Sequence, residues 1–257
     1  MNFDYYQGKR GITSTGLKII AVIIMLIDHI GASVLERFIM ANGATDAMNS
    51  FDFSGPMGNY IIGDVIVRLF GRLAFPIFCF CMVEGFHYTS SRRNYLSRMA
   101  LFALISEVPF DFAHKFTAWD FSHQNVFFTF TIAMAGLWLG EIICEKRGPK
   151  KGNKLIMVAT MVVACIIAYI LNTDYDILGI LTIYVMYFVR ERGRKRTMAW
   201  GSLVLTLGNP IEFTAFLDVI ILHFYNGKRG RGMKYFFYIF YPLHLLILGI
   251  ICAFMGL

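Results

Sequence analysis

Nine apolar runs, separated by short charged clusters, constrain this 257-residue chain more than any other feature of its sequence. Apolar segments of this kind are typical of helices that cross a lipid bilayer. We expect membrane spans at 17–38, 61–87, 95–113, 125–143, 154–171, 176–190, 197–208, 211–225 and 235–255. Several of the later runs are short, so we expect those helices to be tilted, broken or shielded by neighbours. The sequence therefore predicts an all-α fold, a polytopic membrane helical bundle that forms one domain over 1–257.

The composition supports this class and excludes others. Hydrophobic residues make up 57% of the chain and charged residues only 16%, which excludes an ordinary soluble domain. The net charge of +7 does not indicate nucleic-acid binding, because the basic residues lie in short clusters between apolar runs. All five cysteines fall inside apolar runs without zinc-ligand spacing, so no metal site is expected. The lipid bilayer is the expected partner.

The basic clusters predict how the chain is oriented in the membrane. Twenty of the 24 lysines and arginines precede or start the first span, or follow the second, fourth, sixth or eighth. By the positive-inside rule these connections are cytoplasmic. The sequence therefore predicts a cytoplasmic amino terminus and a carboxyl terminus on the outside.

His29 is the residue of the first span that most strongly indicates chemistry. It lies about 16 Å beyond Lys18 along a helix, which is near the bilayer midplane. Ionisable groups at that depth are costly and usually face a cavity or a partner. Histidine is also the side chain most readily used as a general base near neutral pH. We therefore predict His29 as a catalytic base, oriented by Asp28, Glu84 or Glu107, since the adjacent Asp28 points about 100° away.

Further ionisable residues lie inside or at the ends of the later spans. Arg72 and Glu107 lie at similar depths in the second and third spans, which predicts an ion pair between them. Such a pair is more often structural than catalytic. Glu84 and His87 lie near the cytoplasmic end of the second span, and His244 in the last span is interpreted as a hydrogen-bonded structural residue.

Several segments, taken in order, resemble the TraX family of membrane acetyltransferases, within the wider acyltransferase family 3 group. These segments are 17–21, 25–29, 71–78, 83–86, 93–98, 107–109, 124–127, 174–179 and 238–244. In acyltransferase family 3 the first-span histidine is regarded as the catalytic base, and this position matches His29. The arginines after the second span of that family resemble Arg93 and Arg98. Lys18 replaces the usual first-span arginine. TraX is known for acetylating the amino terminus of conjugative pilin.

The resemblance implies an integral membrane acetyltransferase in a bacterial plasma membrane. Acetyl-CoA would be the donor, with its phosphates on Arg93 and Arg98 at the cytoplasmic face and with His87 and Asn125 as further donor-site residues. The acceptor would be an amine or hydroxyl, on a peptide amino terminus or a cell-envelope glycan. His29 would remove the acceptor proton, while Arg72 or Asn125 stabilises the oxyanion.

Two other functions remain open at this point. A proton-coupled transporter of a small solute would use the same ionisable set, Asp28, His29, Arg72 and Glu107, as a relay. A non-enzymatic membrane accessory protein would use the buried charges only to assemble its helices.

Overall fold

The computed structural model describes residues 10–117 and 119–257, and within them the fold is all-α. Two isolated β-bridges, Ile12 with Tyr225 and Gln124 with Thr173, are the only strand-like pairings of these residues. The helices are α1 (Ser14–Ile30), α2 (Glu36–Ala41), α3 (Thr45–Asn49), α4 (Gly58–Gly71), α5 (Ala74–Tyr88), α6 (Arg92–Lys115), α7 (Val126–Arg147), α8 (Asn153–Leu171), α9 (Asp176–Val189), α10 (Arg194–Gly208), α11 (Asp218–His223) and α12 (Lys234–Met255). A π-helical turn, Gly31–Leu35, joins α1 to α2, and 3₁₀ segments occupy Arg190–Arg192 and Pro210–Leu217.

The predicted number of spans is wrong, although each predicted span coincides with helical structure. Within the described part of the chain, five helical segments are long and apolar enough to cross a bilayer, and they are Ser14–Ala41, Gly58–Tyr88, Val126–Arg147, Asn153–Leu171 and Lys234–Met255. The helix α6 has the length but carries too many charged residues. The helices α9 and α10 have 14 and 15 residues, or about 21–23 Å, against a hydrocarbon core of about 30 Å.

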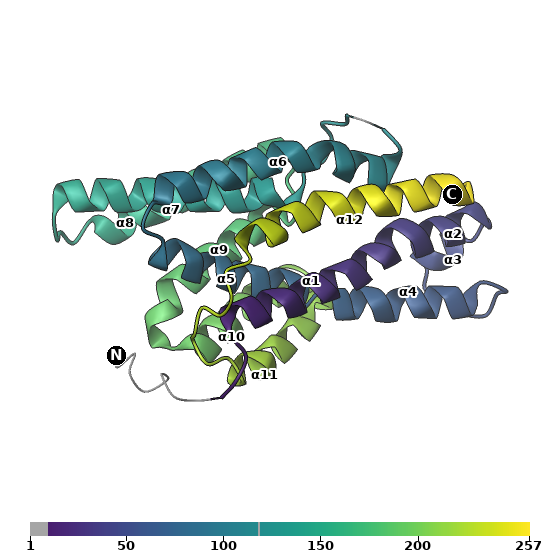
Figure 1. The fold of residues 1–257 in the computed structure, drawn as a ribbon, viewed down its shortest axis with the longest axis horizontal. Coiled ribbons are helices and arrows are strands. Elements are labelled where there is room, and N and C mark those ends of the chain that lie inside the picture. The colour runs from purple at the N-terminus through teal and green to yellow at the C-terminus, as the bar shows by residue number, and fades with distance from the viewer. Residues whose placement is uncertain (1–9, 118) are drawn as a thin grey trace.

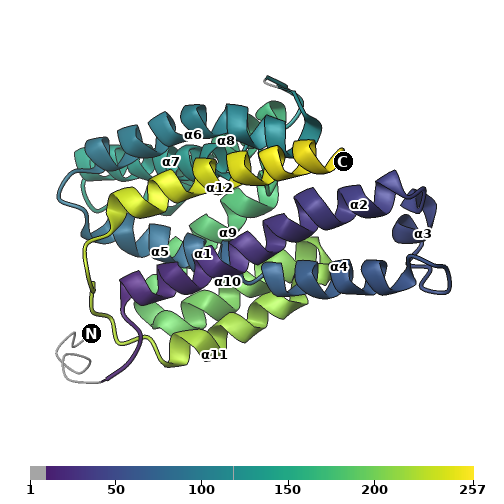
Figure 2. The same cartoon turned by 45° about the vertical axis from the view of Figure 1, so that its right-hand side comes forward.

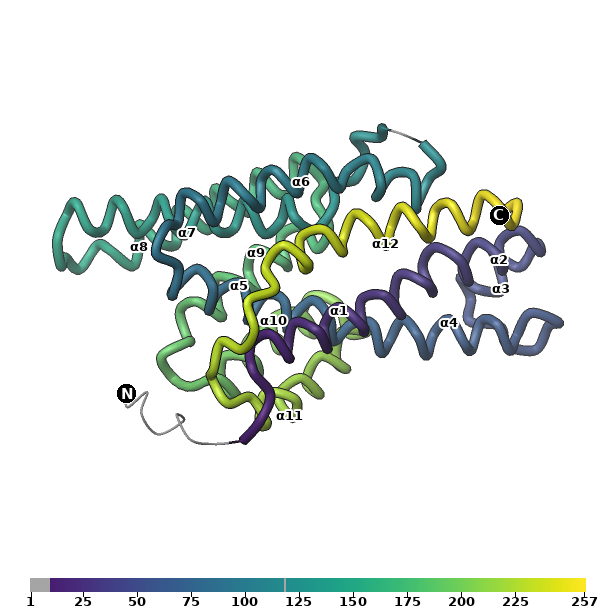
Figure 3. Tube along the Cα trace, viewed as in Figure 1, coloured from purple at the N-terminus to yellow at the C-terminus, as the bar shows by residue number. Residues whose placement is uncertain are grey.

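The helices pack in two halves, with α9 in contact with helices of both halves and with α1 against α12 between them. Figures 1 and 2 show α6, α7 and α8 together on one side, with α12 against α6, and α4, α10 and α11 on the other side. The helix α1 packs on α4 and α5 and also contacts α12. The tube in Figure 3 shows that α1 and α12, the first and last long helices, run side by side in the same direction. Residues near the two ends of the chain are therefore brought together in the core.

Backbone contacts tie the connections together at each end of the bundle. At one end, Ser14 N–H donates to the Lys228 carbonyl over 2.8 Å, and Thr15 Oγ1 donates to the Arg231 carbonyl over 2.6 Å. At the other end, the α6–α7 connection pairs with the α8–α9 connection through Gln124 and Thr173. The starts of α1 and α12 thus share one end, and these two polar loops share the other.

Local sequence explains where several helices begin. Thr13, Ser91 and Asn125 each accept a hydrogen bond from a backbone N–H in the first turn of α1, α6 and α7, respectively. Pro76 does not interrupt a long helix, because the chain already breaks between Gly71 and Ala74 and Pro76 lies in the first turn of α5. A proline at that position costs no helical hydrogen bond.

Candidate functional site

A pair of histidines joins the first and last long helices. His29 Nδ1 lies 2.6 Å from His244 Nε2, and the two rings are parallel, with centroids 4.9 Å apart. His244 Nδ1 lies 2.8 Å from the Phe240 carbonyl, which can only accept, so this nitrogen carries a proton. In a neutral His244 the other nitrogen is then an acceptor, and His29 Nδ1 donates to it. The rings of His114 and Tyr241 approach His29 edge-on, at 6.3 and 6.1 Å between centroids.

The partner of His29 was not among the groups predicted to orient it. The interpretation of His244 as a hydrogen-bonded residue agrees with its bond to Phe240, but its contact with His29 was missed. The sequence spacing could have indicated this contact, because His29 of the first span lies 11 residues after Lys18 and His244 of the last span lies ten residues after Lys234. On two helices that run in the same direction, these spacings place both side chains at similar depths.

Asp28 takes part in a different cluster from its neighbour His29. Its Oδ1 accepts from Arg68 Nη1 over 2.7 Å, and Arg68 Nε lies 3.2 Å from Glu36 Oε1. This cluster joins α1 and α2 to α4. The helices α1 and α4 are so close at this point that a Cβ on Gly71 would lie 2.1 Å from Asp28 Oδ1 and 2.4 Å from Asp28 Cβ.

The predicted Arg72–Glu107 pair is wrong. Arg72 Nη1 lies 3.2 Å from Glu212 Oε1, in the 3₁₀ segment that packs against α4. Glu107 lies in the other half, on α6, where its carboxylate accepts from the Asn125 side chain. Asn125 Nδ2 also donates to the Ala103 carbonyl over 2.8 Å. The predicted depths of Arg72 and Glu107 are similar, but α4 packs mainly on α1 whereas α6 packs mainly on α7 and α12, and depth alone does not indicate lateral position.

The remaining predicted site residues lie near the α5–α6 connection. Glu84 is ten residues beyond the start of α5, or about 15 Å along the helix, and is within electrostatic reach of Arg194 and Arg190. His87 and Arg93 are exposed, and Arg98 bonds to the Tyr238 hydroxyl. The structure therefore divides the nine predicted site residues among several separate clusters. The sequence alone could not assign these residues to different clusters, because their positions along the chain were all consistent with one shared site.

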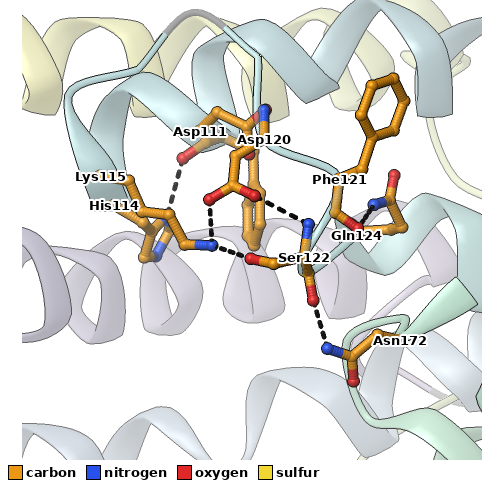
Figure 4. A network of polar contacts seen from close by, with 9 residues as sticks. Asp111, His114, Lys115, Asp120, Phe121, Ser122, Gln124 and Asn172 are labelled. Atoms are coloured by element: carbon orange, nitrogen blue, oxygen red, sulfur yellow. Dashed lines mark hydrogen bonds and ion pairs between the residues drawn. The ribbon is translucent and has the colours of Figure 1, made fainter.

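A polar network in the α6–α7 connection was not predicted (Figure 4). Lys115 Nζ donates to Asp120 Oδ2 over 2.5 Å, Asp120 N–H donates to Asp111 Oδ2 over 2.7 Å, and the Ser122 carbonyl accepts from the Asn172 side chain. The hydrogen bond from Lys115, with two more from Ser122, lowers the pKa of Asp120 to about 2. The network fixes this loop against the α8–α9 connection.

No arrangement of three or more His, Cys, Asp or Glu side chains within residues 10–117 and 119–257 has the geometry to hold a metal ion. The polar side chains of the core instead form hydrogen bonds and ion pairs with one another. The His29–His244 contact joins α1 to α12, Arg68 joins α1 and α2 to α4, Arg72 joins α4 to the 3₁₀ segment, and Asn125 joins α6 to α7.

Comparison with known proteins finds a family and a named relative. The sequence profile described as "TraX protein" matches residues 14–252. The chain is also similar to "Probable fimbrial assembly protein FimC, serogroup H1" of Dichelobacter nodosus, with 26% identity over 206 residues that cover 71% of this chain and 81% of that protein. No solved structure matches.

These matches confirm one part of the sequence interpretation and contradict another. The resemblance to TraX is confirmed, whereas the wider placement in acyltransferase family 3 is not shown. The predicted acyl-CoA-dependent acetyltransferase is contradicted, because the relative is named for fimbrial assembly and neither description names acyl transfer. Acetyl-CoA and an acetyl acceptor are likewise unsupported as partners.

Proposed function

Because the chain belongs to the TraX protein family and has a relative named as a probable fimbrial assembly protein, we propose that it is a non-enzymatic membrane accessory protein of pilus or fimbrial assembly. The observation that carries the proposal is this relative, which the chain matches over most of both lengths. On this proposal the buried polar residues assemble the helices and do not carry out a reaction.

The contacts of the core charges support an assembling role. Arg68 lies between two carboxylates, those of Asp28 and Glu36, and Arg72 pairs with Glu212. These pairs are partly buried, and removing one partner would leave a charge without its partner between two helices, which supports a role in helix assembly. His29 has a histidine for its hydrogen-bonding partner in place of a carboxylate, and this contact holds α12 against α1.

We propose a bacterial plasma membrane as the location, with the basic connections in the cytoplasm. The five long apolar helices suit a bilayer, and α6 would cross it alongside its neighbours α7 and α12, so that Arg92 and Gln124 lie on opposite faces. The helix α8 presents large apolar side chains outward, with Leu155 73% and Ile170 72% exposed. The end tied by Gln124 and Thr173 would then lie outside the cytoplasm, on the side where a pilus is built.

Complementation of a deletion strain tests the proposal. We expect deletion of the gene in its native bacterium to reduce the pili counted by electron microscopy, and a plasmid copy to restore them. A His29→Asn copy should restore them too, because asparagine retains an N–H donor near the position of Nδ1. The matched control is His223→Asn, at an exposed histidine of α11.

Membrane levels of each variant are measured by immunoblotting, so that a folding defect is recognised. Normal piliation in the deletion strain would remove the pilus role. A His29→Asn protein that is present at the parental level but supports no pili would show that the imidazole has a chemical role, which the accessory proposal does not allow.

A further inference from the structure

A cavity of about 350 Å³, lined by both polar and apolar residues, lies beside the α8–α9 connection, where that connection meets Arg72 of the α4–α5 break and the 3₁₀ segment. It is distinct from the histidine pair and from the Asp28–Arg68 cluster, whose residues do not line it. The residues that line it with ionisable groups are Arg72, His123, Asp174, Tyr175, Asp176 and Glu212.

Buried polar atoms without hydrogen-bond partners gather in this lining. Glu212 is only 3% exposed and its Oε2 has no partner, while Thr173 is fully buried and its Oγ1 has none. The same holds for Asp176 Oδ1 and Arg72 Nε. A buried polar atom that makes no hydrogen bond has lost its water without compensation, and four such atoms belong to residues that line this one cavity.

The backbone of the same connection is held in an unusual conformation. Asn172, Tyr175 and Asp176 have φ values of +51°, +59° and +37°, in the left-handed region that favours glycine. They are three of the five non-glycine residues with positive φ in the described part of the chain, and all three line the cavity. Strain of this kind concentrates at functional sites, where the surrounding structure maintains it.

The charges of the residues that line the cavity indicate the charge of its ligand. Three carboxyl groups, those of Asp174, Asp176 and Glu212, face a single guanidinium, that of Arg72, which already pairs with Glu212. An anion would meet this surplus of acidic groups, whereas a cation would favour their ionised forms. The free carboxylate oxygens require hydrogen-bond donors, and Arg72 Nε requires an acceptor.

We propose that the cavity binds a small hydrophilic amine, whose ammonium group donates to Asp176 and Glu212 and whose hydroxyl or carbonyl oxygen accepts from Arg72. The ammonium supplies three donors and a positive charge that offsets the surplus of carboxyl groups over Arg72. This site goes beyond the accessory role in pilus assembly and does not depend on it, because binding is measured on the purified protein.

Three probes of similar size and different charge test the proposal. Ethanolamine is cationic, ethylene glycol is neutral and glycolate is anionic, and all three carry a hydroxyl group. Each is titrated in the millimolar range into the full-length protein in nanodiscs, with binding followed by saturation-transfer NMR. We expect saturable binding of ethanolamine, and no binding of the other two over the same range. Binding of glycolate in preference, equal binding of all three, or no saturable binding of ethanolamine would each overturn the proposal.

Substitutions locate the binding in the cavity. Asp176→Asn and Glu212→Gln each remove one charge at nearly constant shape, and each should weaken ethanolamine binding by about 10- to 100-fold, as expected for a lost charge-assisted hydrogen bond. Asp46→Asn, at an exposed carboxylate of α3, makes the same change in net charge and should leave binding unaltered. If Glu212→Gln fails to fold because Arg72 loses its partner, Asp176→Asn still decides the question. Unchanged binding in a folded Asp176→Asn protein would show that ethanolamine binds elsewhere.

Discussion

Replacing Gly71 by alanine is expected to destabilise the protein, because Gly71 lies where α4 meets Asp28 of α1. A new Cβ would lie 2.1 Å from Asp28 Oδ1, 2.4 Å from its Cγ and 2.4 Å from its Cβ. Rotation of the carboxylate alone cannot relieve the last contact, so the backbones of the two helices must move apart. That movement also lengthens the 2.7 Å bond between Asp28 and Arg68.

The size of the effect follows from three contributions. Forcing an extra carbon into a packed core costs about 1–3 kcal/mol. Loss of a charge-assisted hydrogen bond costs about 1.5–3 kcal/mol, part of which Arg68 recovers through its second partner, Glu36. The higher helix propensity of alanine offsets at most about 1 kcal/mol, and less at the last residue of a helix. We therefore expect a net loss of about 2–4 kcal/mol in the free energy of unfolding.

Gly63→Ala is the matched control, because Gly63 lies in the same helix and its Cβ would meet only Leu35 Cδ2, at 3.9 Å. Thermal unfolding in mild detergent, followed by circular dichroism, should give a lower midpoint for Gly71→Ala and an unchanged or higher one for Gly63→Ala. Equal midpoints for the two variants would refute the close approach of α1 and α4.

Other perturbations test other parts of the structure. The pKa of Asp120 lies below that of an unfolded aspartate, so the stabilising effect of its ionised form is present above about pH 4 and is lost as the pH falls towards about 2. The Asp120→Asn substitution should therefore flatten this part of the curve of unfolding free energy against pH, measured by denaturant unfolding. The Asn125→Ala substitution should lower the free energy of unfolding by about 2–4 kcal/mol, because α7 loses its N-terminal cap and the buried Glu107 loses its hydrogen-bond partner. A change below about 1 kcal/mol would contradict both contacts. Single cysteines at the exposed Ser122 and Lys150, in a cysteine-free background, should be labelled by impermeant maleimide from opposite faces of the membrane, and labelling from one face would contradict the proposed orientation.

The helical class was predictable because apolar periodicity and basic clusters depend only on local sequence. The error in the number of spans has a local cause as well. The helix α6 has the length of a span but includes four more charged side chains beyond its first two arginines, those of Arg98, Glu107, Asp111 and Lys115. The helices α9 and α10 are too short to cross the bilayer alone. Runs of apolar residues indicate burial in lipid or in protein alike, so they do not distinguish a span from a helix covered by its neighbours.

The polar contacts were predictable only in part, because they depend on which helices are neighbours. Glu107 and Arg72 were both identified as core residues, but their partners, Asn125 and Glu212, follow from packing on α7 and on the 3₁₀ segment. The cavity was missed because its strained residues, Tyr175 and Asp176, have no glycine to signal a left-handed backbone.

The contacts between the two ends of the chain have a consequence for how the protein is made. Thr15 and Arg229 are 214 residues apart in sequence, and His29 and His244 are 215 apart. The first helix is therefore synthesised long before the residues that hold it, and both contacts must wait for the segment from Arg229 to His244. A chain that stops before α12 leaves α1 without its closing partner and exposes a polar face to lipid. Docking of α12 on α1 thus completes the contacts of the first helix, and a chain cut before α12 lacks them.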